Sequence, residues 1–80
     1  MPEWCEDLTE RSLEEVMASE AQNRIWSKEL RQGTAALVAK RLAKDISLLE
    51  YKTQREAVRE EAAECTRRAF KLVTEINRRA

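Results

Sequence analysis

The second half of the chain carries the most regular hydrophobic pattern in the sequence. Apolar residues recur there at alternating spacings of four and three positions. Such spacing places side chains on one side of a helix and is typical of the a and d positions of a coiled coil. The residues of this seam are Val58, Ala62, Cys65, Ala69, Leu72 and Ile76. The pattern predicts a helix that buries one side against another helix.

A second apolar stripe precedes this seam and is offset from it. It consists of Leu30, Leu37, Val38, Leu42, Ile46 and Leu49. The change of phase falls in the polar run 50–56, which still consists mostly of good helix formers. A phase change of this kind resembles a stutter, which locally unwinds a supercoil without ending the helix. We therefore expect helix on both sides of the change.

Two capping patterns near the N-terminus predict where the helix begins. In Asp7-x-x-Glu10 and Ser12-x-x-Glu15, the first side chain can accept a hydrogen bond from a free N–H of the first helical turn, and the second can return it. The basic residues of the last turns suit the negative end of a helix dipole. The expected organisation is one domain, residues 1–80, with a lead-in over 1–7 and helix over about 8–79.

Charge alternates along the chain in four blocks, and this alternation favours one antiparallel arrangement. The net charges are −6 for residues 1–20, +5 for 21–44, −3 for 45–64 and +4 for 65–80, which sum to zero. A turn at Gly33 would place basic segments beside each other, whereas a centre near Lys44 makes each block face one of opposite sign. Facing positions then have numbers that sum to about 88: Val16 with Leu72, Ala18 with Phe70, and Asn23 with Cys65.

Two architectures satisfy this antiparallel register. One is a nearly continuous long helix paired with an antiparallel copy of itself, and the other is a helical hairpin that turns at residues 43–47. We favour the continuous helix, because residues 43–47 contain no glycine, proline or asparagine to make a turn. Gly33 then lies within the helix at a cost of about 1 kcal/mol, with a break there as a further alternative. The fold class is all-α in every case.

Side chains suited to catalysis or metal binding are scarce. There is no histidine, and the two cysteines, Cys5 and Cys65, are far apart in the sequence, so the usual zinc ligand sets cannot form. The carboxylates of Glu60, Glu61 and Glu64 belong to a solvated charge run rather than a dry pocket. Cys65 suits the seam as a small buried residue. We expect no catalytic residue, no metal, no cofactor and no small-molecule substrate.

Basic clusters raise nucleic acid as a partner, but the overall charge argues against it. The clusters around Lys40 and after Arg67 are matched by acidic blocks of similar size, whereas a phosphate-binding surface normally carries excess positive charge. A small helical nucleic-acid-binding regulator is therefore the weakest alternative. The sequence has no apolar run long enough to cross a membrane and no apolar leader, and its cysteines need no disulfide. These features predict a soluble intracellular protein, cytoplasmic or nuclear.

The sequence thus predicts a protein-interaction module rather than an enzyme. The self-complementary charge blocks favour a coiled-coil homo-oligomer, with an antiparallel dimer as its expected form. Trp4 and Trp26 are unusual in a plain coiled coil, and they favour instead a surface that binds helices of other proteins, as in a cytoskeletal, kinetochore, secretion or trafficking complex. Trp4 and Leu8 are candidate partner anchors, although we favour a packing role for them at the helix start. The expected interaction seam comprises Val16, Trp26, Leu30, Leu37, Leu42, Ile46, Leu49, Val58, Ala62, Cys65, Ala69, Leu72 and Ile76.

Overall fold

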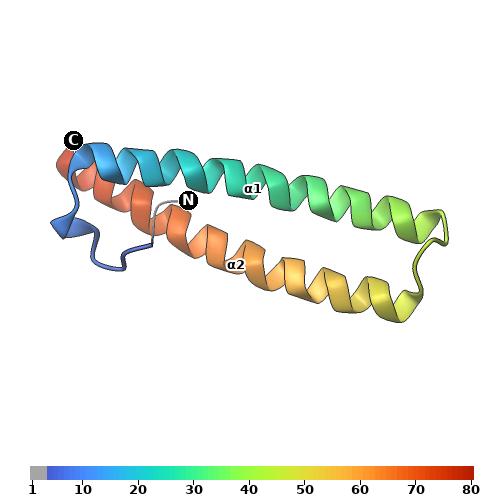
Figure 1. The fold of residues 1–80 in the computed structure, drawn as a ribbon. Coiled ribbons are helices and arrows are strands. Elements are labelled where there is room, and N and C mark those ends of the chain that lie inside the picture. Colours follow the sequence, from blue (N-terminus) through green and yellow to red (C-terminus); the bar gives the residue numbers. More distant parts are fainter. Residues whose placement is uncertain (1–3) are drawn as a thin grey trace.

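The computed structural model describes residues 4–80, and it shows two long helices folded into an antiparallel hairpin (Figure 1). A short 3-10 helix, η1, spans Leu8–Glu10, and it is followed by α1, Leu13–Leu42, and α2, Leu48–Arg79. The hairpin measures 49 × 19 × 16 Å along its principal axes, and the longest of these dimensions is the length of one such helix. The all-α fold and the hairpin are confirmed, and the single continuous helix that we favoured from the sequence is wrong.

The turn between the two helices explains why the continuous helix is wrong. Lys44 has a φ of 61°, in the left-handed region. Its N–H donates to the carbonyl of Arg41 at 3.0 Å, and the next N–H, of Asp45, donates to the carbonyl of Lys40 at 2.9 Å. These two bonds form a Schellman motif, in which glycine usually occupies the left-handed position. A lysine fills it here, at a cost of about 1–2 kcal/mol, so the turn lacks its usual sequence signature.

Serine caps begin both long helices. The Oγ of Ser12 accepts from the N–H of Glu15 at 3.1 Å, and the Oγ of Ser47 accepts from the N–H of Glu50 at 3.1 Å. Ser47-x-x-Glu50 therefore repeats the pattern that predicted a helix start near the N-terminus. The sequence therefore contains a start signal for the second helix, and the lack of glycine, proline and asparagine at residues 43–47 does not override it.

The first capping pattern serves a separate short element. Asp7 accepts a hydrogen bond from the N–H of Thr9 at 3.1 Å and caps η1 rather than the long helix. The helix expected from about residue 8 therefore begins at Leu13. Gly33, in contrast, lies within α1 without breaking it, and a Cβ added there would meet no atom within 4 Å. Between Leu13 and Arg79 the chain turns only at residues 43–47.

The register of the hairpin is the one expected from the charge blocks. The side-chain amide of Asn23 donates to the carbonyl of Cys65 at 3.1 Å, and Val16 meets Leu72 in the core. The expected contact of Ala18 with Phe70 does not form, because Phe70 is 75% exposed. The sum of two residue numbers predicts which residues lie at the same level along the hairpin. It does not predict the direction of a side chain, which depends on the angle of the residue around its helix.

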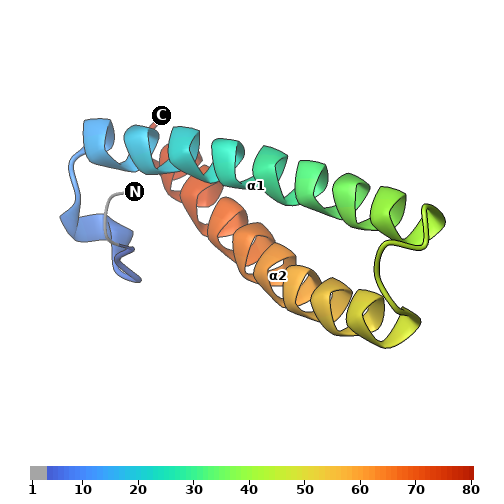
Figure 2. The same cartoon turned by 45° about the vertical axis from the view of Figure 1, so that its right-hand side comes forward.

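The hydrophobic core is small and lies mostly in the half of the hairpin near the termini. The buried hydrophobic residues are Leu8, Val16, Leu37, Cys65 and Leu72. Leu37 alone represents the half near the turn, and the two helices diverge toward that turn (Figure 2).

The conformation of Lys44 can be tested by substitution. Lys44→Gly should raise the free energy of unfolding by about 1 kcal/mol, since glycine adopts the left-handed region without the clash that a Cβ causes. For a domain of this size the melting temperature should rise by about 4–8 °C in thermal unfolding followed by circular dichroism. Lys44→Ala removes the same charge but keeps the Cβ, so it should give no such gain. A glycine variant less stable than the alanine variant would contradict the left-handed turn.

Candidate functional site

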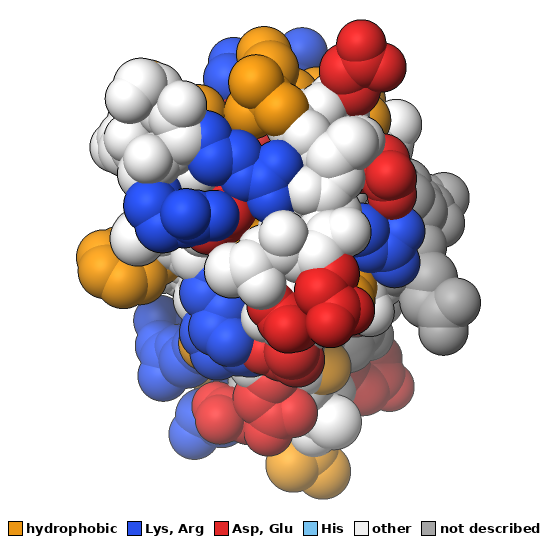
Figure 3. All heavy atoms as spheres, turned by 90° about the vertical axis from the view of Figure 1, so that its left-hand side faces the viewer, with side chains coloured by type: hydrophobic (Ala, Val, Ile, Leu, Met, Phe, Trp, Pro, Cys, Tyr) orange, Lys and Arg blue, Asp and Glu red, His pale blue; other side chains and the backbone are white. Residues whose placement is uncertain are grey.

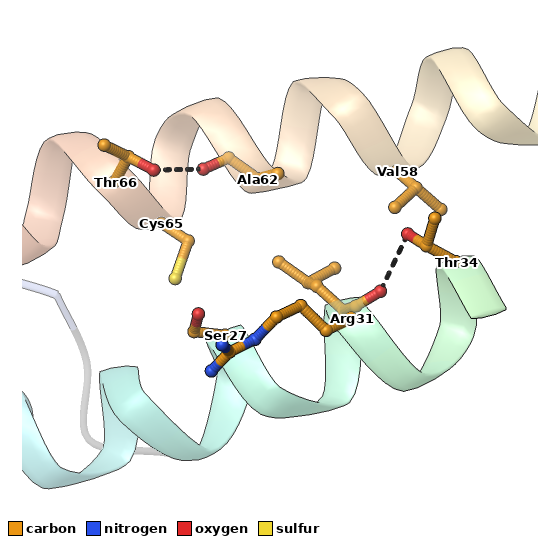
Figure 4. A pocket seen from close by; sticks show the side chains of 8 residues that line it. Ser27, Arg31, Thr34, Val58, Ala62, Cys65 and Thr66 are labelled. Carbon is orange, nitrogen blue, oxygen red and sulfur yellow. Dashed lines mark hydrogen bonds between the residues drawn. The ribbon is translucent and has the colours of Figure 1, made fainter.

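A groove with a volume of about 240 Å³ lies between α1 and α2 in the middle of the hairpin (Figure 4). Both helices contribute to its walls: Ser27, Leu30, Arg31 and Thr34 from α1, and Val58, Ala62, Cys65 and Thr66 from α2. The Cys65 side chain points into the space between the helices (Figure 4). Leu30, Val58 and Ala62 are the aliphatic members of the lining, and Arg31 is its one permanently charged member.

The two threonines make the groove more apolar than their residue type suggests. The hydroxyl of Thr34 donates to the carbonyl of Leu30 at 3.0 Å, one turn earlier in α1. The hydroxyl of Thr66 donates in the same way to the carbonyl of Ala62 at 3.0 Å in α2. Because both hydroxyls are satisfied within their own helices, the methyl groups are the parts left to contact an occupant. The groove therefore suits an apolar side chain.

A buried polar contact joins Cys65, which lines one end of the groove, to Asn23 of α1. Asn23 is 7% exposed and Cys65 is 4% exposed, and the Sγ of Cys65 lies 3.6 Å from the carbonyl oxygen of Asn23. Together with the amide bond in the other direction, this contact ties the two helices at one level. Sliding one helix along the other would leave a buried amide without its partner, at a cost of about 1–3 kcal/mol. The two helices therefore meet in a fixed register at this end of the groove.

Exposed apolar side chains extend the groove toward both ends of the hairpin. Residues seven positions apart lie nearly in line along a helix, because about 3.6 residues make one turn. Three such rows pass through groove residues. One row lies on α1 and contains Met17, Arg24, Arg31 and Val38. Two rows lie on α2: the first contains Leu48, Arg55 and Ala62, and the second contains Arg59, Thr66 and Val73. A fourth row, from Leu13 to Ser27 and Thr34, also reaches the groove on α1.

We call this side of the hairpin the open face. It consists of the groove residues together with Leu13, Met17, Val38, Leu48 and Val73, all of them exposed. These five large apolar side chains share one side of the molecule, where they border the groove at its two ends. Large apolar side chains that gather on one side of a molecule are typical of a site of interaction.

The N-terminal segment covers a different side of α2. The guanidinium of Arg68 lies 4.9 Å from the ring centroid of Trp4 and 5.4 Å from that of Trp26, so it is held by cation–π contact with both rings. Arg68 follows Thr66 by two positions, or about 200° around the helix, which places it away from the open face. Leu8 enters the core beside Leu72, and Trp4 packs against that core.

Ion pairs hold this segment in place against α2, at the end of the hairpin that Figure 3 views. Glu6 accepts from Arg67 at 2.8 Å and from Lys71 at 2.5 Å. Arg79 donates to the carbonyl of Leu8 at 2.7 Å, which anchors η1 to the last turn of α2. Lys, Arg, Asp and Glu side chains interleave over this end (Figure 3). The segment is therefore held by charge as well as by packing.

Arginines lower the pKa of several carboxyl groups in this region. Hydrogen bonds from Arg67 and Arg68 lower the pKa of Glu64 to about 2. Those from Arg78 and Arg79 do the same for Glu75, whose pKa also falls to about 2. Bonds from Arg67, Lys71 and Trp4 hold the pKa of Glu6 well below its ordinary value. In each case the charged form is favoured by a cationic donor.

The structure places most of the predicted seam between the two helices of one chain. Val16, Leu37, Cys65 and Leu72 are buried there, and seven others are half-buried: Trp26, Leu30, Ile46, Val58, Ala62, Ala69 and Ile76. Leu42 and Leu49 are 79% and 75% exposed near the turn, so they are not part of the buried contact. Trp4 and Leu8 have the packing role favoured for them. Binding of the seam to a second chain stays a prediction.

The open face itself was not predicted, although the sequence carried a signal for it. In three adjacent apolar pairs the first member is buried and the second is exposed: Val16 and Met17, Leu37 and Val38, Leu72 and Val73. Adjacent positions on a helix lie about 100° apart, so a pair of apolar neighbours cannot face a single partner helix. Such pairs indicate a helix with two contact sides.

Comparisons with protein-family models, with curated proteins and with solved structures found no match to this chain. Within residues 4–80, neither helix is long and apolar enough to cross a membrane. The same residues contain no group of three or more side chains that could hold a metal ion. The candidate site is thus described by its shape and surface chemistry, as an apolar groove with arginine at its rim.

Neighbouring residues of α2 should differ sharply in their contribution to stability. Leu72 is 1% exposed and Val73 is 46% exposed. Leu72→Ala should lower the free energy of unfolding by about 2–5 kcal/mol through the cavity that it leaves, whereas Val73→Ala should cost less than about 1 kcal/mol. Urea unfolding measured by circular dichroism would show the difference. Equal losses at the two positions would mean that both side chains are buried by a second chain.

Stability should also depend on pH through the arginine-bound carboxylates. The folded-state pKa of Glu64 and Glu75 is about 2, below the ordinary 4.5, so their contribution is complete above about pH 4.5 and is lost as the pH falls toward 2. The urea midpoint should decrease over this range. The decrease in the urea midpoint should be smaller in Glu64→Gln, which lacks one of these carboxylates. It should be as large in Glu60→Gln as in the unmodified chain, because Glu60 forms no ion pair within residues 4–80. A midpoint constant between about pH 5 and pH 2.5 would argue against these bonds.

Proposed function

We propose that this chain is a non-enzymatic protein-interaction module whose open face binds a helix of another protein chain. One observation carries the proposal: more large hydrophobic side chains are exposed than are buried. Nine are exposed, five of them on the open face, against five buried hydrophobic residues, within the part of the chain that the structure describes. Apolar surface is stabilised by removal from water, so a surface of this composition favours association.

The total exposed surface supports the same proposal. The chain exposes 6003 Å², whereas a compact monomer of 9.3 kDa would expose roughly 5,000 Å². The excess of about 1,000 Å² is close to the area of about 800 Å² that one partner contributes to a standard protein interface. One additional helix laid along the groove would bury surface of this order.

The shape of the open face favours a helix over other partners. Two antiparallel helices leave a groove along their length, and helical bundles fill such grooves with further helices. An amphipathic helix presents apolar side chains at positions i, i+3 or i+4, and i+7, which can follow the line from Met17 through the groove to Val38. The titratable side chains that line the groove are Arg31 and Cys65. Such a lining supports binding rather than acid–base catalysis.

The charge blocks no longer favour a homo-oligomer as they did in the sequence alone. Each block already faces one of opposite sign inside the hairpin, as the contact of Asn23 with Cys65 demonstrates. A second copy is therefore not needed to satisfy the pattern. The proposal concerns the open face, which the intramolecular pairing of the helices leaves uncovered.

Substitutions on the open face should abolish binding without unfolding the hairpin. The double variant Met17→Glu, Val73→Glu places two charges on the open face, and both positions are exposed. A fluorescent peptide of about 21 residues, with leucine at a and d positions and glutamine at the flanking ones, serves as the probe. The variant should bind it at least about tenfold more weakly than the unmodified chain in fluorescence anisotropy, with the same helix content.

Leu49→Glu is the matched control, because Leu49 is 75% exposed but lies on another side of α2. It follows Leu48 by one position and is therefore turned about 100° around the helix. This control should keep the affinity of the unmodified chain. Absence of binding to peptides of this leucine pattern, whatever their flanking residues, in a chain that sediments as a monomer, would refute the proposed function.

A further inference from the structure

We propose that the occupant of the open face is an acidic amphipathic helix of a different protein, rather than a second copy of this chain. The inference rests on the proposed function and adds the chemistry of the partner. It follows from the charged side chains that share the open face with the apolar ones.

Basic residues border the groove on both helices. On α1, Arg24 and Arg31 occupy the same row as Met17 and Val38. On α2, Arg55 lies two turns before Ala62, and Arg59 lies two turns before Thr66; both of these later residues line the groove. Lys52 precedes Arg59 by another two turns. The rows that form the open face thus carry four basic side chains, Arg24, Arg31, Arg55 and Arg59, and the same spacing extends them to Lys52 and Arg41.

Most of this positive charge is not compensated within the hairpin. Arg24 pairs with Glu20, the acidic residue in the row of Leu13. Arg31, Arg55 and Arg59 are exposed and form no ion pair with another residue of 4–80. Lys52 likewise forms none there. The open face therefore carries a net positive charge, although the whole chain has none.

The arginines lie where they can contact both flanks of a helix in the groove. Arg31 belongs to the α1 wall, and its side chain runs along α1 toward Ser27 (Figure 4). Arg55 and Arg59 lie on α2 outside the lining itself, seven positions before the groove residues Ala62 and Thr66. In helical pairs, residues that flank the apolar seam form the ion pairs that select the partner. An occupant with leucine-type residues in the groove and Asp or Glu on both flanks would match this arrangement.

A second copy of the chain matches the open face poorly. In a symmetric dimer the same surface meets itself, so arginines of one open face would approach those of the other. Of the acidic residues of α2, Glu64 and Glu75 are bonded to arginines on the side beside the N-terminal segment, and Glu56 and Glu60 line a shallow hollow with Lys52 rather than the groove. Like charges brought together at an interface are unfavourable and exclude the wrong partner.

Nucleic acid matches the open face less well than a helix does. Phosphate contacts would use the arginines, but Met17, Val38, Leu48 and Val73 lie in the same rows and would gain nothing from phosphate or sugar. An amphipathic helix uses both kinds of side chain at once, because it buries the apolar residues and pairs with the basic ones. The combination is what specifies the partner.

The test compares three labelled peptides of about 21 residues, identical at their leucine a and d positions and carrying glutamate, glutamine or lysine at the flanks. In fluorescence anisotropy at low salt, the glutamate peptide should bind the full chain at least about tenfold more tightly than the lysine peptide. The difference should shrink as salt is raised from about 0.05 M to about 0.5 M, because ions screen exposed charges.

Two matched variants locate the effect on the open face. The double variant Arg31→Glu, Arg59→Glu should reverse the preference, so that the lysine peptide binds more tightly. The control Lys40→Glu makes a similar change on an exposed residue of α1 outside the four rows. It should keep the preference for the glutamate peptide. Equal loss of preference in the control would show that net charge alone is responsible and would overturn the inference.

The remaining outcomes separate the inference from the proposed function. Equal affinity for all three peptides overturns the inference but leaves the proposed function intact. No binding of any peptide by a monomeric chain refutes both. A dimer in sedimentation velocity that excludes the peptides identifies a second copy as the occupant and overturns the inference. Tighter binding of a labelled DNA duplex than of the glutamate peptide, abolished by the double variant, overturns it in favour of nucleic acid.

Discussion

The buried contact between Asn23 and Cys65 is the interaction on which the arrangement of the hairpin depends. Two amphipathic helices can pack in several registers at similar hydrophobic gain, because apolar contact is not directional. A buried amide is directional, and it is costly to leave unpaired. Its bond to the carbonyl of Cys65 fixes the level at which the helices meet. The core contact of Val16 with Leu72 and the position of the turn follow from that level.

Both ends of the hairpin close in ways that do not involve the open face. At the turn, Lys44 accepts a left-handed conformation so that the last carbonyls of α1 find partners. At the other end, Leu8 fills the core and Trp4 covers it, with Arg68 between Trp4 and Trp26. The N-terminal segment therefore completes one side of a two-helix structure that would otherwise have two open sides. The opposite side keeps its apolar groove.

The open face combines two properties that a single helix pair does not need. Its apolar side chains add to the exposed surface without stabilising the hairpin, and its arginines repel one another across the groove. Both features are unfavourable for the isolated chain, and both become favourable with an apolar, acidic helix in the groove. This is the physical reason for assigning the surface to a partner rather than to folding.

The sequence alone determined the helical class, the antiparallel direction and the pairing level near 88, because hydrophobic period and charge blocks act along the chain and can be counted. It also contained the cap at Ser47 and the neighbouring pair Leu72 and Val73, whose meaning needed a structure to recognise. Only the tertiary structure decided that pairing occurs within one chain, since the left-handed Lys44 carries no sequence signature. It alone decided which stripe is buried and which remains open, because that depends on the angle at which α2 meets α1, and the open side is where we place the partner.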